Sequence, residues 1–144
     1  MSYHYFRSFI AAVRYDLALW DMKIAFRFRD GLSYGGRALD QRHKPNHSVD
    51  MIIHIAKDQS EQYTRRIIAH ELRHVWQHKH NLLTYEWSYG EWVTVWDGVP
   101  YPNALLDRLF YATHDGYKHL PFERDADEYA DDVSRRWEND TCTR

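Results

Sequence analysis

Large hydrophobic side chains alternate with other residues in part of the first third of the chain, and this alternation predicts a small β-sheet. In residues 22–29 every second position is a large hydrophobic residue, which is the period of a half-buried strand. Asp30-Gly31 then favours a turn. Residues 37–44 have a weaker strand pattern and residues 49–56 a stronger one. Together these segments predict a short, largely antiparallel sheet.

The spacing of hydrophobic residues changes to the helical period in three other segments. Residues 3–20 mix apolar and charged positions as an amphipathic helix does. Ser60 suits the start of a second helix, and Asn81, which tolerates the left-handed conformation, suits its end. Pro121 suits the first turn of a third helix. The apolar residues that recur at helical spacing in this third helix are Phe122, Ala126, Tyr129, Val133 and Trp137.

The helix expected between Ser60 and Asn81 has two different faces. On a helical wheel, one arc carries the hydrophobic residues Ile68, Ala69, Leu72, Val75 and Trp76. The opposite arc carries the polar residues His70, Glu71, His74 and His78. We expect the hydrophobic arc to pack on a core layer and the polar arc to face away from it.

Residues 85–101 are rich in aromatic side chains, and Trp96-Asp97-Gly98 predicts a hairpin turn among them. Pro100 limits how regular the following strand can be, because proline donates no backbone hydrogen bond. No repeat or linker divides the 144 residues. We therefore expect a single α+β domain over residues 1–144, with residues 139–144 as a frayed tail.

Composition narrows the classes of function. The formal net charge is −2, and Lys and Arg are scattered along the chain without the basic stripe of a nucleic-acid binder. The lone Cys142 excludes an intrachain disulfide and a thiolate zinc site. No hydrophobic run approaches a membrane span or the core of a signal peptide. The expectation is a cytoplasmic monomer without nucleic-acid or membrane partners.

The strongest chemical pattern is the HExxH motif His70-Glu71-Leu72-Arg73-His74. Its two His residues lie one helical turn apart, so both imidazoles can bind one tetrahedral zinc ion. Glu71 lies close enough to reach a water at that ion. A catalytic zinc site usually has three protein ligands, so the chain must supply another.

Glu123, on the later helix, is the candidate third ligand. Asp127 follows it at i+4 spacing, so the two carboxylates lie on one face. Glu123 can complete a zinc shell, and Asp127 can accept the other ring N–H of a ligand His, which fixes its tautomer. Small residues beside these carboxylates would let the two helices approach closely: Ala126, Ala130 and Ser134.

An HExxH motif followed on a later helix by ExxxD resembles the gluzincins, the thermolysin-like metallopeptidases whose third zinc ligand is a glutamate. Residues 70–77 (HELRHVWQ) and 121–127 (PFERDAD) look like the motifs of compact metallopeptidases encoded by prokaryotes and phages. Trp96-Asp97-Gly98, between these motifs, is also similar to that group. The resemblance implies a zincin-like fold.

The resemblance also implies a role for each matching residue. His70, His74 and Glu123 would be the zinc ligands. Glu71 would be the general base, and Asp127 would position a ligand His.

Two further family features concern the substrate. The family sheet holds the substrate backbone on its edge strand, and residues 49–56 are the matching candidate here. The Tyr or His with which thermolysin-like enzymes stabilise the transition state has no match in the motifs, so this role stays open. Tyr117, His114 and His119 precede the later helix and could serve, but a structural role explains each of them more simply.

Other His residues compete for the third-ligand position. His80 matches the last position of the metzincin motif HExxHxxGxxH, but Gln77 replaces its glycine and no Met-turn follows. His78 lies two helical turns beyond the first ligand, too far to reach the same ion. A SprT-like arrangement, in which His114 or His119 completes the site of a DNA-associated protease, stays open.

The pattern as a whole predicts a zinc-dependent metallopeptidase that hydrolyses peptide bonds in a peptide or protein substrate. Zinc would polarise the scissile carbonyl and activate a water, while Glu71 moves the proton. The alternative is a non-catalytic binding module in which zinc clamps two helices. Glu71 argues against this alternative, because a structural zinc site needs no base.

Overall fold

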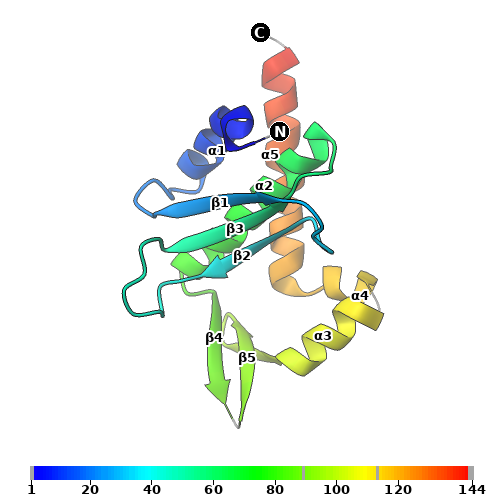
Figure 1. Cartoon of the computed structure of the whole chain (residues 1–144). Coiled ribbons are helices and arrows are strands. Elements are labelled where there is room, and N and C mark those ends of the chain that lie inside the picture. Colours follow the sequence, from blue (N-terminus) through cyan, green and yellow to red (C-terminus); the bar gives the residue numbers. More distant parts are fainter. Residues whose placement is uncertain (1, 89, 113, 143–144) are drawn as a thin grey trace.

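The computed structural model describes residues 2–88, 90–112 and 114–142, with the backbone alone at residues 111, 112, 114, 115, 141 and 142. The described chain forms two three-stranded sheets and five helices (Figure 1). This mixture confirms the α+β class. Three of the four strand pairings are antiparallel, and the one parallel pairing lies in the first sheet, which was expected to be largely antiparallel.

The first sheet consists of β1 (Ile24–Arg29), β2 (Gly36–Asp40) and β3 (Met51–Ala56) in the spatial order β1-β3-β2. All three strands were predicted, although the second ends at Asp40 and not at residue 44. β3 pairs parallel with β1 and antiparallel with β2. Because β3 inserts between two strands that run in opposite directions, it must be parallel to one of them. The hydrophobic pattern carries no information about this insertion.

The central position of β3 overturns one expectation. Residues 49–56 were the candidate for an edge strand that holds a substrate, but both sides of β3 are occupied by neighbouring strands. A strand that is paired on both sides has no free backbone groups to offer a peptide. The edge strand that contacts the motif helix is β2 instead.

The second sheet consists of β4 (Leu83–Ser88), β5 (Glu91–Trp96) and β6 (Val99–Pro102), all antiparallel. Asp97 and Gly98 have φ values of 47° and 81°, so the predicted hairpin turn is present between β5 and β6. β6 is short, as Pro100 requires. The β4–β5 hairpin was not predicted, because its aromatic residues follow no clear alternation of polar and apolar positions.

Three helices pack with the first sheet into the larger hydrophobic core: α1 (Tyr3–Asp16), α2 (Glu61–Lys79) and α5 (Pro121–Cys142). In Figure 1, α2 lies behind the sheet and α5 runs alongside α2. The predicted first helix ends at Asp16 rather than at residue 20, since Ala18 has a φ of 54° and cannot continue it. α5 begins at Pro121 as predicted. It continues to Cys142, so residues 139–142 of the expected frayed tail are helical, and residues 143–144 lie outside the described residues.

A second, smaller core joins the second sheet to the start of α5. It contains the buried side chains of Leu83, Leu120 and Phe122. Two helices that were not predicted, α3 (Asn103–Ala112) and α4 (His114–Lys118), connect β6 to α5 (Figure 1). None of the described helices is both long enough and apolar enough to cross a membrane.

Gly36 of β2 lies directly against α2, where any larger residue would collide with the helix. A Cβ atom at this position would come within 2.5 Å of Ile67 Cγ2 and 3.1 Å of Glu71 Cγ. We expect Gly36→Ala to push β2 away from α2 and to lower the free energy of unfolding by about 1–3 kcal/mol. Urea denaturation measures this loss.

A second variant tests whether Ile67 causes the effect. Ile67→Ala removes the methyl group that the new Cβ would strike, so Gly36→Ala should cost less in this background than in the parent protein. Equal costs in both backgrounds would contradict the close approach of β2 to α2.

Candidate metal centre

The helix that carries the HExxH motif is defined by capping residues that were predicted from the sequence. The Ser60 hydroxyl accepts a hydrogen bond from the backbone N–H of Tyr63 at 3.2 Å, and Asn81 has a left-handed φ of 57°. Between them, α2 presents its hydrophobic arc to the first sheet and α1. The polar arc does not face solvent, because α5 and β2 cover it. His70, Glu71 and His74 are 9%, 5% and 8% exposed.

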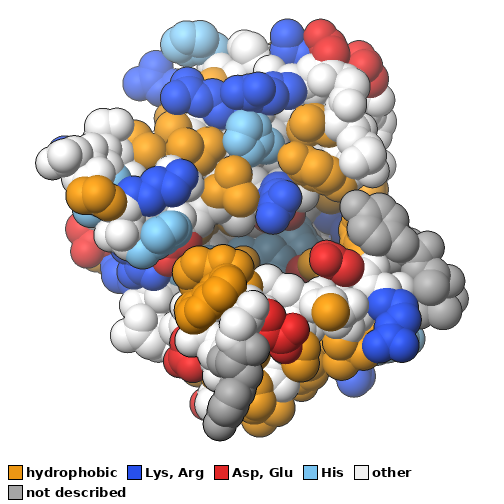
Figure 2. Space-filling view, turned by 60° about the horizontal axis from the view of Figure 1, so that its bottom comes forward, with side chains coloured by type: hydrophobic (Ala, Val, Ile, Leu, Met, Phe, Trp, Pro, Cys, Tyr) orange, Lys and Arg blue, Asp and Glu red, His pale blue; other side chains and the backbone are white. Residues whose placement is uncertain are grey.

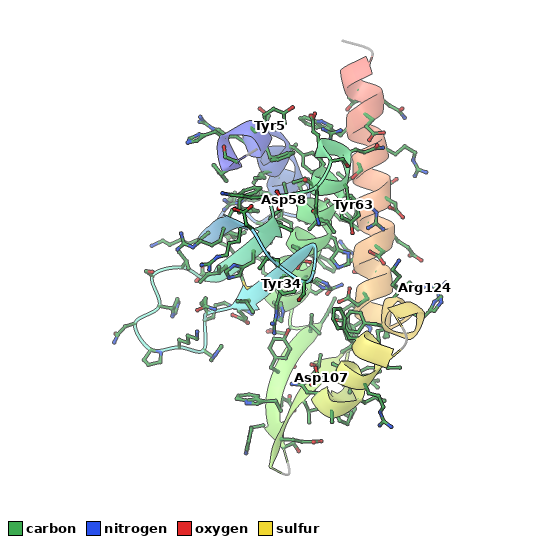
Figure 3. All side chains as sticks on the ribbon, turned by 45° about the vertical axis from the view of Figure 1, so that its right-hand side comes forward. Tyr5, Tyr34, Asp58, Tyr63, Asp107 and Arg124 are labelled. Atoms are coloured by element: carbon green, nitrogen blue, oxygen red, sulfur yellow. The ribbon has the colours of Figure 1, made fainter. Side chains whose placement is uncertain are left out.

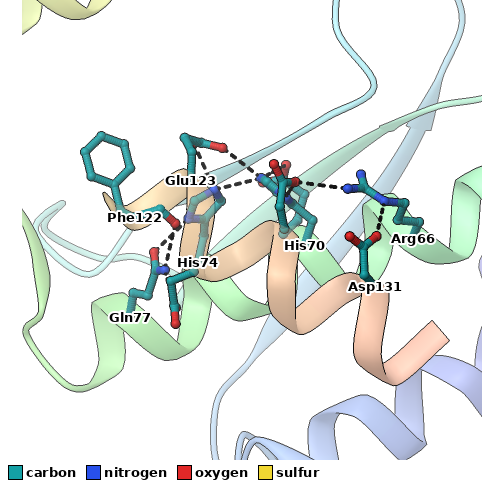
Figure 4. A network of polar contacts seen from close by, with 10 residues as sticks. Arg66, His70, His74, Gln77, Phe122, Glu123 and Asp131 are labelled. Atoms are coloured by element: carbon teal, nitrogen blue, oxygen red, sulfur yellow. Dashed lines mark hydrogen bonds and ion pairs between the residues drawn. The ribbon is translucent and has the colours of Figure 1, made fainter. Parts of the chain in front are cut away.

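α5 packs along α2 and brings Glu123 to the two motif His residues (Figure 4). Ala126 and Ala130 of α5 are completely buried at this contact and Ser134 is nearly so. Their small size permits the close approach that was expected from the sequence. Glu123 lies in the first turn of α5, directly after Pro121 and Phe122, so the start of the helix fixes its position.

Four side chains converge at this point. Glu123 Oε2 lies 3.0 Å from His70 Nε2, and Glu123 Oε1 lies 3.2 Å from His74 Nε2. The two Nε2 atoms are 3.0 Å apart. Glu71 Oε1 lies 3.9 Å from His70 Nε2, and the ligand atoms of His70, Glu71 and His74 all lie within 4.8 Å of one another.

This donor set fits a zinc ion. Ligand atoms at the usual zinc distances in a tetrahedral shell lie about 3.3 Å from one another. The separations between His70, His74 and Glu123 are close to that value, whereas Glu71 stands slightly farther off. Two imidazoles and one carboxylate also match the donor types that zinc prefers in catalytic sites.

The ring of each motif His also forms a hydrogen bond through its Nδ1 atom, on the side away from Glu123. His70 Nδ1 donates to Asp127 Oδ1 at 2.8 Å, which is the contact expected from the i+4 spacing of Glu123 and Asp127. His74 Nδ1 donates to Gln77 Oε1, also at 2.8 Å. These bonds direct both Nε2 atoms toward Glu123.

Sequence reasoning missed the role of Gln77. Its amide donates hydrogen bonds to the backbone oxygen of Phe122 and to Asp125, so it joins His74 to the start of α5 (Figure 4). Asp125 is in turn paired with Arg73. The position of Gln77 three residues after His74, on the same helix face, was the available signal.

Charge balance in the cluster favours imidazolium rings next to carboxylates. Burial lowers the pKa of His70, but hydrogen bonds to Asp127 and Glu123 outweigh it and raise this pKa to about 10. Burial also opposes the charged form of His74, yet the charge of Glu123 raises its pKa overall. The pKa of Glu123 is lowered, because the two His residues more than offset its burial. Zinc would have to displace the protons held on these rings.

The proton held by His70 makes the stability of the metal-free protein depend on pH. An unfolded His has a pKa of about 6.5, so between this value and about 10 the folded protein binds more protons than the unfolded chain. This contribution to stability is complete below pH 6.5 and is lost as the pH rises toward 10. At the acid end, the lowered pKa of Glu123 makes its contribution complete above about pH 4.5, and that contribution is lost as the pH falls.

We therefore expect the melting temperature in the presence of a chelator to decline between pH 6.5 and 10. Zinc binding needs neutral imidazoles, so the stabilisation by added zinc should instead grow as the pH rises from 5 to 8. Thermal unfolding across this range, with chelator and with zinc, measures both trends. His70→Asn should flatten the alkaline decline. A chelated parent protein with a constant melting temperature from pH 6.5 to 10 would contradict the proton-sharing arrangement.

Glu71 lies between α2 and the free edge of β2. Burial raises the pKa of its carboxyl group, while the nearby His70 and His74 charges oppose this shift. The backbone N–H of Ala38 in β2 donates a hydrogen bond to the same carboxylate. A raised pKa makes this carboxylate a stronger acceptor for a proton.

His70 and His74 are largely buried but keep 9% and 8% of their surface exposed. Figure 2 shows a hollow with His side chains at its floor and hydrophobic, basic and acidic side chains around its rim. Tyr85 of β4 is 47% exposed, but burial of its hydroxyl end raises its pKa, and the charges of Glu123 and Glu71 act on it. Burial and the neighbouring Glu123 likewise raise the pKa of Tyr117, whose hydroxyl hydrogen-bonds to that carboxylate. Two phenols thus lie near the cluster.

The described contacts of His78, His80 and His119 do not include His70, Glu71 or Glu123. His78 is buried 3.8 Å from Asp40, and burial lowers its pKa to about 4. His80 caps α2 and its ring packs on Trp76. His119 is exposed after α4, and the side chain of His114 lies outside the described residues.

Comparison with models of protein families, with curated proteins and with solved structures finds no match to this chain. Its function is therefore inferred from the geometry of the His70, Glu71, His74 and Glu123 cluster.

Proposed function

We propose that the chain is a zinc-dependent peptidase of the gluzincin type, with His70, His74 and Glu123 as zinc ligands. The observation that carries the proposal is the convergence of two imidazoles and one carboxylate at separations of 3.0 to 3.2 Å, with Glu71 beside them. His119 is exposed and none of the described contacts joins it to this cluster, which favours Glu123 over His119 as third ligand.

The residues around the cluster fit the steps of peptide hydrolysis. Bound zinc supplies a Lewis acid that polarises a carbonyl group and makes a water easier to deprotonate. Glu71 takes the proton from the attacking water and passes it to the leaving amine. Burial raises the pKa of the Glu71 carboxyl group, which favours uptake of a proton, and the Ala38 hydrogen bond orients the carboxylate. Asp127 and Gln77 keep the two imidazoles oriented.

The substrate chain would lie along β2. This strand forms the sheet edge beside α2, and its Ala38 N–H points to Glu71. An extended peptide can add to such an edge through backbone hydrogen bonds. The Tyr85 hydroxyl, on which the charges of Glu123 and Glu71 act, is the candidate donor for the developing oxyanion.

Metal content and hydrolysis measured on one preparation test the proposal. Zinc should bind at one ion per chain, and cleavage of an unfolded protein such as reduced casein should stop with chelator and return with zinc. Stoichiometric zinc without cleavage of any unfolded substrate would instead support a module in which zinc clamps α2 to α5. Absence of zinc binding would overturn both functions.

A further inference from the structure

The outward face of the first sheet carries a compact group of basic side chains. The inward face is hydrophobic and packs on the helices, so alternate residues of each strand point the other way. The outward residues include Arg27 of β1, His54 of β3 and Arg37 of β2. Arg27 and Arg37 both pair with His54 in the strand register, which places the three side chains in one row across the sheet. Arg29 stands beside this row on β1.

The three arginines are exposed and have no ion-pair partner among the described residues. Most of the other arginines contact a carboxylate, as Arg66 and Arg73 do. Burial lowers the pKa of His54 most, and the positive charges of Arg29, Arg27 and Arg37 lower it further. All three arginines therefore lie close enough to act on the His54 ring. Like charges in such a group repel one another and attract an anionic partner.

One end of the basic row, at Arg37, lies near the candidate metal centre. Arg37 is adjacent to Ala38, whose N–H contacts Glu71, and the charge of Arg37 also acts on the Tyr85 hydroxyl. Figure 2 shows a line of Lys and Arg side chains on the same face of the molecule as the hollow. A chain bound along β2 would therefore pass next to Arg37, and Arg27 and Arg29 lie farther across the same sheet face on β1.

The size and chemistry of the group favour an acidic peptide over a nucleic acid. Neighbouring strands lie about 4.8 Å apart, and alternate residues of one strand lie about 6.6 Å apart. The basic group therefore covers about 10 Å across the strands and about 7 Å along them, which is enough for a few carboxylates. Single-stranded nucleic acids are usually held on aromatic side chains within a longer basic groove. The outward positions beside the arginines carry small or aliphatic residues instead: Ala25, Leu39, Ile52 and Ala56.

We propose that Arg27, Arg29 and Arg37 form a docking surface for an acidic segment of the protein substrate. That the bound acidic segment belongs to a substrate rests on the proposed peptidase function. The surface gives the peptidase a preference for unfolded chains in which Asp or Glu residues lie near the bond to be cut.

Binding is measured with the Glu71→Gln protein, so that no probe is cleaved. The probes for fluorescence anisotropy are a short labelled Glu-rich peptide, the same peptide with Gln for Glu, and a thymidine oligonucleotide of similar length. The test variant adds Arg27→Gln, Arg29→Gln and Arg37→Gln. The control variant adds Arg124→Gln, Arg135→Gln and Arg136→Gln, which remove the same charge from α5; Figure 3 shows Arg124 on the outside of that helix.

The Glu-rich peptide should bind more tightly than the Gln peptide, and the test variant should weaken its binding about tenfold while the control variant changes it little. Circular dichroism of the variants checks that each is folded. Unchanged binding in a folded test variant would overturn the docking surface, and so would tighter binding of the oligonucleotide through the same arginines. Because the assay needs no hydrolysis, it gives its answer even if the proposed peptidase activity fails.

Discussion

Glu71→Gln should lower the rate of peptide hydrolysis by about 10²- to 10⁴-fold while leaving zinc bound at one ion per chain. Gln has nearly the same shape as Glu and can still accept the hydrogen bond from the Ala38 N–H, but it cannot take a proton from water. Folding should be preserved, because burial already disfavours the charged carboxylate at this position. Steady-state cleavage of a quenched fluorescent peptide and metal analysis of the same sample measure the two effects.

A matched substitution on the same helix separates the chemistry from a general loss of charge. Glu61→Gln removes an exposed carboxylate that pairs with Arg65 in the first turn of α2, and its activity should equal that of the parent protein. Full activity in the Glu71→Gln protein would refute the proposed role of Glu71 as base. Loss of zinc from that variant would show that Glu71 is itself a ligand.

Glu123→Gln should weaken zinc binding more than any substitution outside the ligand set. Glu123 is the only described residue whose carboxylate lies within 3.2 Å of both His70 Nε2 and His74 Nε2, and a neutral amide is a poor zinc donor. Asp127→Asn should weaken binding by about 10- to 100-fold, since His70 is the only proposed zinc ligand that Asp127 contacts among the described residues. Competition with a chromophoric chelator ranks the two variants.

Glu128→Gln provides the control on the same helix, because this exposed residue pairs only with Arg124 in the described contacts. Its zinc affinity should match that of the parent. If Glu123→Gln binds zinc as tightly as the parent, the gluzincin arrangement is wrong and another group completes the site. A larger loss for Asp127→Asn than for Glu123→Gln would reverse the assigned roles of the two carboxylates.

Local sequence signals were sufficient for the helices that carry the candidate site. Ser60 and Asn81 bound α2, and Pro121 begins α5, because capping and proline preferences depend on neighbours along the chain. The spacing of His70 and His74 determined that their rings share one face. That Glu123 would meet them was a hypothesis from pattern, and the packing of α2 on α5 produces the contact.

Strand order could not be derived in the same way. The pattern of residues 49–56 correctly predicted a strand with one buried face. A central strand and an edge strand that both pack on helices have the same alternation of buried and exposed residues, so this pattern does not distinguish them. The edge position of β2 depends on the insertion of β3 between β1 and β2. The hydrophobic pattern therefore could not decide whether β2 or β3 has a free edge at which a peptide could bind.

By itself, the sequence predicted the α+β class, the limits of the two motif helices and a set of candidate metal ligands, because periodicity, capping and ligand spacing act over a few residues. Only the tertiary structure decided which backbone edge faces Glu71, that Gln77 supports His74, and that scattered arginines gather on one sheet face. Each of these depends on contacts between segments far apart in the chain. The HExxH motif thus suggested the chemistry that we propose, and the packing of α2, α5 and β2 determines which groups surround the motif.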